Sequence, residues 1–263
     1  MMNRLINRCL MLGLVFSLTA CKSFWNRSEE DINPYKGLSE KQLYDEAKHA
    51  LAKDQYASAI KRYEAMESMY PFSNYAEQAQ LDLMYAYYKN DDFPSSAATA
   101  ERFIRLYPRA ERVDYAYYMK GMANFQQPRG ALANIIPVNE SWRDPGTETQ
   151  AYSDFASLVQ RFPDSRYKSD ALQRMIYLRN MFAKRELNTA NYYFERKMYV
   201  AAAGRASGLI KDYPQAPSVQ QALVILYQAN QALGLTQAAQ DAKTVYQASY
   251  PNQAMSFGLV EQS

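Results

Sequence analysis

The side chain best placed for covalent chemistry is a cysteine at the end of an apolar run near the amino terminus. The stretch Leu10–Ala20 is eleven residues long and is followed at once by Cys21, whose thiolate is a nucleophile. Eleven residues are too few to span a bilayer of about 30 Å as a helix, but they suit a secretory signal peptide. We therefore expect residues 1–20 to be a signal that is cut immediately before Cys21.

The motif around this cut, Leu18-Thr19-Ala20-Cys21, resembles the bacterial lipobox. In that motif the cysteine sulfur receives a diacylglycerol, and the new amino terminus receives a further acyl chain, here expected to be palmitoyl. A single acyl chain binds membranes only marginally, whereas two or three together anchor a protein stably. The alternative is an ordinary signal peptide followed by an incidental cysteine.

Residues 21–38 are expected to be a lipidated flexible tether, because they are polar and are broken by Pro34 and Gly37. Fully extended, this tether would reach at most about 60 Å. Lys22 follows the cysteine, and by resemblance to enterobacterial lipoproteins the lack of aspartate there favours the outer membrane over the inner one.

The remaining composition indicates neither a nucleic-acid partner nor a catalytic centre. Without Arg4 and Arg8 the mature chain has 28 basic residues (30 minus 2) against 27 acidic ones, a net charge near +1. His49 is the single histidine and Cys9 leaves with the signal, so no disulfide and no Cys/His metal cluster can form within the mature chain. The sequence also lacks a glycine-rich phosphate loop and a Gly-x-Ser-x-Gly elbow. We expect a binding protein with no catalytic residues, no metal and no cofactor other than the lipid on Cys21.

The elements that would position a binding site are helices that recur along the chain. Each of these helices ends at an aromatic residue followed by proline. The five prolines are spaced by 37, 55, 51 and 37 residues. Small or apolar residues stand 12, 8 and 5 positions before each proline, with Lys243 as the exception, and this spacing marks one face of a helix. Proline disfavours the α conformation in the preceding residue and so ends that helix. The pairs are Tyr70-Pro71, Tyr107-Pro108, Phe162-Pro163, Tyr213-Pro214 and Tyr250-Pro251.

A second amphipathic helix precedes each of these helices, and Ser39 with Gln42 offers a capping box to begin the first one. Paired helices with a period in the mid-thirties, small residues at the closest crossing and a closing proline resemble the tetratricopeptide repeat (TPR). We therefore predict an all-α fold, a TPR solenoid of about five helix pairs. An irregular helical bundle is the alternative.

The two long spacings predict where the solenoid is interrupted. The third repeat has 18 extra residues (55 minus 37), which we assign to an insertion at about 126–148. The 14 extra residues before Pro214 (51 minus 37) add about four turns to one long helix, from about Tyr167 to Lys197. The expected modules are residues 39–163 with three repeats and 164–251 with two, followed by a tail at 252–263.

Tyrosines on the first helices of the repeats indicate a binding groove. The chain has 23 tyrosines, and the first helices of a TPR stack line its concave face. Tyrosine offers apolar contact area with a polar tip, so this face would suit an extended peptide with aromatic side chains, its terminal carboxylate meeting Lys48 or Lys89. The alternative is that most of these rings pack between helices. The residues expected on this face are Tyr44, Lys48, Tyr85, Tyr88, Lys89, Tyr115, Tyr118 and Met122.

A second candidate surface is the stretch "KMYVAAAGRASGLIKDYP". Gly204 and Gly208 lie four residues apart on one helix face, although glycine in a helix costs about 1 kcal/mol relative to alanine. Small residues let another chain approach closely, and Arg205 beside them could bind a carboxylate with two hydrogen bonds. The alternative is close packing within the repeat and a solvated arginine.

Several segments together resemble the BamD family, lipoproteins of the outer-membrane β-barrel assembly machinery. The most specific is "QLDLMYAYYKN", and "SDFASLVQRFPDSRY", "ANYYFERKMYV" and "RASGLIKDYP" fit the same family. The resemblance runs from about Asn33 to Pro251 and is weakest at Gln126–Glu140 and in the final repeat.

The resemblance implies a non-catalytic scaffold, lipid-anchored at the periplasmic face of the outer membrane. The C-terminal module would dock on a POTRA domain of a BamA-like partner, with Arg205 pairing a glutamate and Arg196 in a neighbouring position. The N-terminal module would recognise the aromatic-ended C-terminal strands of unfolded outer membrane proteins. BamC-like and BamE-like lipoproteins would be further partners.

Two other functions are compatible with a lipidated helical-repeat protein. One is a pilotin-like factor for type IV pili, which would share the lipobox, the tether and the solenoid. The other is an enzyme or a peptidoglycan-binding protein, against which the missing catalytic motifs argue. Depletion distinguishes the first alternative, because loss of pili alone would support it and a general loss of outer-membrane barrels would not.

Overall fold

The computed structural model describes residues 34–127 and 146–255. The predicted signal peptide, Cys21, most of the tether and most of the 126–148 insertion lie outside the described residues, as does the end of the tail. The described residues form ten α-helices and no strand. These are α2 (Glu40–Ala52), α3 (Tyr56–Met69), α4 (Ala76–Lys89), α5 (Phe93–Leu106), α6 (Val113–Gln126), α7 (Gly146–Arg161), α8 (Lys168–Glu195), α9 (Tyr199–Asp212), α10 (Val219–Ala232) and α11 (Thr236–Ser249).

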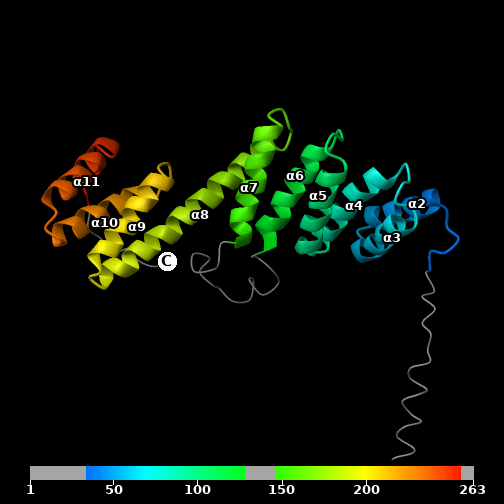
Figure 1. The fold of residues 1–263 in the computed structure, drawn as a ribbon, viewed down its shortest axis with the longest axis horizontal. Coiled ribbons are helices and arrows are strands. Elements are labelled where there is room, and N and C mark those ends of the chain that lie inside the picture. Colours follow the sequence, from blue (N-terminus) through cyan, green and yellow to red (C-terminus); the bar gives the residue numbers. More distant parts are fainter. Residues whose placement is uncertain (1–33, 128–145, 256–263) are drawn as a thin grey trace, which may run out of the picture.

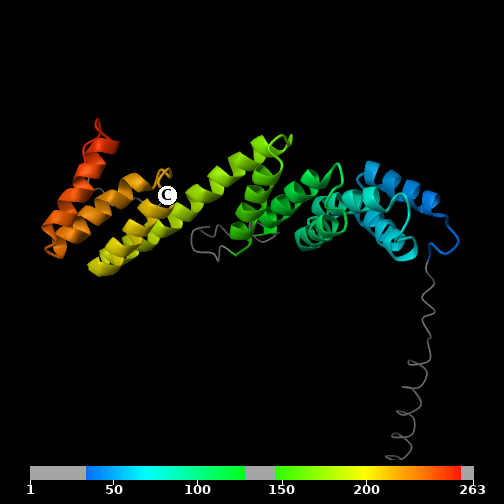
Figure 2. The same cartoon turned by 45° about the horizontal axis from the view of Figure 1, so that its top comes forward.

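Each helix packs against the next one along the chain, so the molecule is a row of five helix pairs. Figures 1 and 2 show this elongated row, with α2 and α3 at one end and α10 and α11 at the other. The predicted all-α TPR solenoid is confirmed. None of the helices in the described ranges is both long and apolar enough to cross a membrane.

The helix-face pattern before each proline forms the core of the repeat. Residues 12 and 5 positions before the prolines are at most 2% exposed in all five copies. The aromatic residue before proline ends the helix, as when the Tyr70 amide donates to the Met66 carbonyl oxygen at 2.8 Å. The buried residues are Ala59, Ser96, Ala151, Ala202 and Ala239, with Met66, Phe103, Leu158, Leu209 and Tyr246.

The turns between the paired helices share a feature that the sequence pattern did not reveal. In four repeats the residue 17 positions before the proline has a left-handed backbone, at Asp54, Asp91, Lys197 and Gly234, with φ between 57° and 73°. Aspartate and glycine tolerate this conformation comparatively well, whereas lysine adopts it less readily. The first helix of the row begins with the predicted capping box of Ser39 and Gln42, which is confirmed.

Helix α8 is a single helix of 28 residues, close to the predicted bounds. Its first half buries Ala171 and Leu178 in one core cluster together with residues of α6 and α7. Its second half buries Leu187 and Ala190 in another cluster, with residues of α9, α10 and α11. One continuous helix therefore links these two core clusters in the middle of the row, as Figure 1 shows for α8 between α7 and α9.

Candidate functional site

The two glycines of α9 face open space. Among residues 34–127 and 146–255, no heavy atom outside the backbone of α9 lies within 4 Å of a Cβ atom added at Gly204 or Gly208. At Gly121 of α6, by contrast, an added Cβ atom would lie 2.6 Å and 2.7 Å from ring atoms of Phe155. Close packing within the chain therefore explains Gly121 but not the α9 glycines. Ala202 and Ala206 of the same stretch are buried within the repeat, so internal packing accounts for these alanines, and a partner surface at the two glycines stays a prediction.

Arg205 lies beside these glycines and is held loosely. Its guanidinium Nη1 donates to Glu186 Oε2 of α8 at 3.2 Å, and the two side chains are 50% and 35% exposed. A solvent-exposed ion pair of this kind stabilises a protein by at most about 1 kcal/mol. A carboxylate on another chain could therefore replace Glu186 as the partner of Arg205 at little cost in stability.

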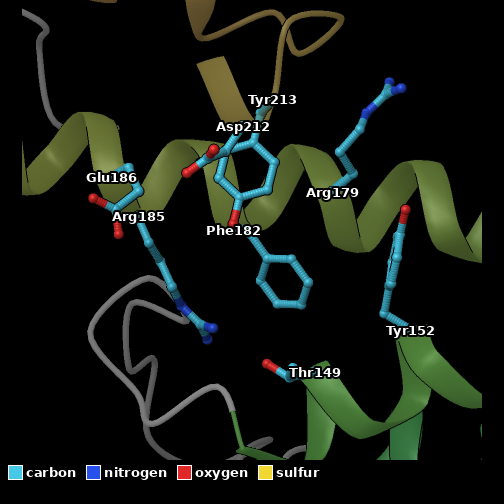
Figure 3. Close-up of a pocket in the computed structure, with 8 residues that line it drawn as sticks. All are labelled: Thr149, Tyr152, Arg179, Phe182, Arg185, Glu186, Asp212 and Tyr213. Carbon is cyan, nitrogen blue, oxygen red and sulfur yellow. The ribbon is translucent and has the colours of Figure 1, made fainter. Parts of the chain in front are cut away.

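Gly204, Arg205 and Gly208 line a cavity of about 520 Å³ between α8 and α9. A second cavity, of about 420 Å³, adjoins it, because Glu186, Asp212 and Tyr213 line both. Figure 3 shows the second cavity, with side chains projecting into it from α7, from α8 and from the end of α9. We call the two cavities together the α8–α9 groove.

A buried ion pair fixes one wall of the α8–α9 groove. Arg185 Nη2 of α8 donates to Glu148 Oε2 of α7 at 2.6 Å, and both side chains are about nine-tenths buried. Removing one partner of such a pair leaves an uncompensated buried charge, which typically costs 3–5 kcal/mol. The pair therefore holds α7 against α8 and positions the groove between them.

Arg196, the other predicted partner-binding arginine, contacts different residues from Arg205. It follows the end of α8, and its guanidinium stacks on the ring of Tyr192 at 3.6 Å from the ring centroid. Within the described ranges it does not line either cavity of the groove. The structure thus brings together Gly204, Arg205 and Gly208, and leaves Arg196 as a separate exposed cation.

The predicted tyrosine face begins at the N-terminal pair with a hydrogen-bonded cluster. Tyr44 is only 8% exposed and stacks on Tyr75, with ring centroids 4.9 Å apart. Its hydroxyl and that of Tyr63 both donate to Asp82 Oδ2, at 3.4 Å and 3.2 Å. Burial raises the pKa of the Tyr44 hydroxyl to about 12, and burial also raises the pKa of the Asp82 carboxyl, against the effect of these hydrogen bonds. Tyr44 is therefore mainly a structural residue.

A second aromatic cluster lies where α6 meets the start of α8. Tyr118 stacks on Tyr167 with ring centroids 4.6 Å apart, and Tyr115 contacts the same ring. The Tyr118 hydroxyl donates to Asp170 Oδ2 at 2.8 Å, and Arg174 donates to the same carboxylate. Burial raises the pKa of the Tyr118 hydroxyl to about 12. Both predicted tyrosines are partly exposed, so this cluster combines aromatic rings with charged groups.

The remaining residues predicted on this face vary in exposure. Tyr85 is 38% exposed, whereas Tyr88 is partly buried and packs edge-on against Phe93. The ammonium group of Lys89 lies 5.7 Å from the Tyr56 ring centroid, and that of Lys48 lies 6.0 Å from the Tyr44 ring centroid. Met122 is 8% exposed and belongs to the core. Tyr85 is thus the most accessible of the five predicted tyrosines.

The part of the chain that the structure describes contains no group of three or more His, Cys, Asp and Glu side chains arranged to hold a metal ion. The lipidation site predicted at Cys21 lies outside the described residues. Sequence reasoning missed Glu186 and Asp212, because each is one of many acidic residues on helix surfaces. Asp212 lies on α9 itself, seven residues after Arg205, whereas only the packing of α8 on α9 brings Glu186 to Arg205.

Comparisons with known proteins agree over most of the chain. A family model, YfiO, described as an outer membrane lipoprotein, matches residues 36–245. A Vibrio cholerae protein named outer membrane protein assembly factor BamD is 42% identical over 206 residues, which cover 78% of this chain and 86% of the relative. Proteins with the same name from Neisseria meningitidis and Xylella fastidiosa are 38% and 34% identical; each match covers 92% of this chain, with 90% and 81% of the relatives.

Proposed function

Because this chain belongs to the BamD family of outer membrane protein assembly factors, we propose that it is a non-catalytic scaffold that holds a BamA-like partner and binds unfolded outer membrane proteins. Both tasks require surfaces for other chains rather than a reaction centre. The open patch of α9 and the aromatic face of the N-terminal pairs are suited to these tasks. The names of the relatives favour this role over pilus assembly.

The protein would act while anchored to the outer membrane by lipid on Cys21, as S-diacylglycerol and N-palmitoyl groups. The family description as an outer membrane lipoprotein supports this anchor. The helical body would then lie on the periplasmic face, within reach of the polar tether. BamC-like and BamE-like lipoproteins would be additional partners in the same assembly.

The observation that carries the scaffold proposal is the unfilled space above Gly204 and Gly208, next to the loosely paired Arg205. A partner backbone can approach these glycines closely, while an acidic side chain of the partner replaces Glu186 at the guanidinium. A POTRA domain of the BamA-like partner, presenting a glutamate, fits this surface. Arg196 would contribute at the edge of the contact.

The test is the charge reversal Arg205→Glu, with copurification of the BamA-like protein from detergent-solubilised envelopes as the measurement. We expect the partner to be lost, since truncating one side of a buried charge pair at an interface typically costs 2–5 kcal/mol. Lys61→Glu is the control, because it reverses an exposed charge on α3, in the first helix pair and away from α9, and should retain the partner. Equal recovery with both variants would remove Arg205 from the interface.

The proposed receptor surface is the tyrosine face, with Tyr85 as its accessible member. A photo-crosslinking benzoylphenylalanine at position 85 should capture the C-terminal strand of a newly exported barrel protein. The same group at Val245 of α11, which is 48% exposed, is the control and should not capture it. Crosslinks from position 85 only to other parts of this chain would contradict the receptor role.

A further inference from the structure

A third cavity lies outside both of these surfaces, where the first two Tyr-Pro turns come together beside α4. It measures about 350 Å³, within the range of roughly 300–1,000 Å³ that is common for ligand sites. Tyr70 and Phe72 line it from the first turn, and Leu106 and Tyr107 line it from the second. Phe72 is 98% exposed and Leu106 is 58% exposed, so the rim of this cavity presents apolar side chains to solvent. We call it the turn cavity.

Two buried polar atoms among the residues that line the turn cavity lack partners. Gln80 is only 6% exposed, and its Oε1 atom accepts no hydrogen bond within the described part of the chain. Arg102 Nε is buried there and makes no hydrogen bond either, although Nη2 of the same side chain donates to both oxygens of Glu67, at 2.6 Å and 2.7 Å. Buried polar atoms without partners are rare, because leaving them unpaired is unfavourable.

The two unpaired atoms indicate which hydrogen-bonding groups a ligand of this cavity would need. Gln80 Oε1 needs a hydrogen-bond donor, Arg102 Nε needs an acceptor, and a peptide group carries one of each. The charge of Arg102 is already balanced by the Glu67 carboxylate, so the cavity does not call for an anion such as phosphate. The exposed Phe72 and Leu106 add an apolar rim for a side chain next to that peptide group.

We propose that the turn cavity binds an extended peptide segment of a partner protein, with an apolar side chain held between Phe72 and Leu106. One backbone N–H of the segment donates to Gln80 Oε1, and a carbonyl oxygen accepts from Arg102 Nε. This site is separate from the α8–α9 groove and from the tyrosine face, since Gln80 lies on a different side of α4 from Tyr85. The inference does not depend on the proposed function.

The experiment uses the full chain in detergent with ¹³C-labelled methionine methyl groups. Met66 lines the turn cavity, and its resonance is identified by its loss in Met66→Leu. The probe is N-acetyl-leucine N′-methylamide, which has two peptide groups and one apolar side chain. We expect it to shift the Met66 signal with a Kd on the order of 1 mM, typical for a ligand of this size. Its fully N-methylated analogue, which has no N–H, should bind about fivefold more weakly.

Three variants test the assignment of atoms. Gln80→Met keeps the length of the side chain but removes the acceptor, and should weaken the amide about five- to tenfold, to the level of the N-methylated analogue. Gln78→Met is the matched control on the opposite side of α4 and should leave the titration unchanged. Phe72→Ala, at a position that is 98% exposed, should weaken both compounds.

Two results would overturn the proposal. Equal affinity of the amide and its N-methylated analogue for the unaltered chain would mean an apolar cavity without peptide recognition. No response of Met66 up to the solubility limit of the amide would mean that the cavity takes up no peptide at all. Circular dichroism of each variant confirms that the helices are intact.

Discussion

At the scale of single residues, the helices of this chain contain two kinds of glycine. Gly121 is required by its neighbour, since the buried Phe155 ring occupies the place of a Cβ atom. Gly204 and Gly208 have no such neighbour in the part of the chain that the structure describes, and glycine in a helix is about 1 kcal/mol less favourable than alanine. Since no neighbour within the described chain requires glycine at 204 and 208, we expect another chain to contact these positions.

Gly204→Ala should therefore raise the free energy of unfolding by about 0.5–1 kcal/mol, because the methyl group restricts the unfolded chain and meets no obstacle in the folded one. Urea unfolding followed by circular dichroism measures this change. The same substitution should weaken binding of the BamA-like partner. A variant that is destabilised would show that the space above α9 is not open.

Gly121→Ala provides the matched comparison on α6. Here the added methyl group would overlap the Phe155 ring, and we expect a loss of roughly 1–3 kcal/mol in the same measurement.

The sequence alone could predict the candidate residues on α9 but not the atoms that they face. The spacing of Gly204 and Gly208 and the intervening Arg205 is visible in one helix. Glu186, which pairs with Arg205, and Phe155, which explains Gly121, come from other helices and are recognised only after packing. For the same reason helical periodicity placed Tyr44 on the concave face, whereas its ring is buried against Tyr75.

At the scale of helices, the repeat was predictable because each copy contains the same residues at the positions where its helices pack and end. The aromatic-proline pair and the small residue 12 positions earlier recur in all five copies, and both are visible without any alignment. The left-handed turn residue 17 positions before the proline was not predictable, because aspartate, lysine and glycine share that place. The division into modules 39–163 and 164–251 stays a prediction.

Helix α8 is long enough to connect two core clusters, because it buries Leu178 in one and Leu187 in the next. Lys184 is exposed between them. Lys184→Pro should lower the free energy of unfolding by about 3 kcal/mol or more, because proline removes a helix hydrogen bond and clashes with the preceding turn.

Lys184→Ala is the control and should stay within about 0.5 kcal/mol of the unaltered chain. Urea unfolding compares the two variants. A loss well below 1 kcal/mol for the proline variant would show that α8 need not be continuous between the two core clusters.

At the scale of the whole molecule, the row of helix pairs separates three surfaces along one chain. The tyrosine face and the turn cavity belong to the first three pairs, whereas the α8–α9 groove lies along α8, between α7 and α9. A solenoid keeps such surfaces apart because each pair contacts mainly its neighbours. This arrangement suits a protein that brings several chains together at one membrane.

Depletion of the protein in its own cells, followed by measurement of folded outer-membrane barrels, tests the assembly role most directly. Folded barrels migrate differently from unfolded ones on unheated gels, so the folded fraction of many barrel proteins can be read in parallel. We predict that folded barrels decline across the board, while inner-membrane proteins are unaffected. Normal barrel levels with loss of pili alone would contradict this account.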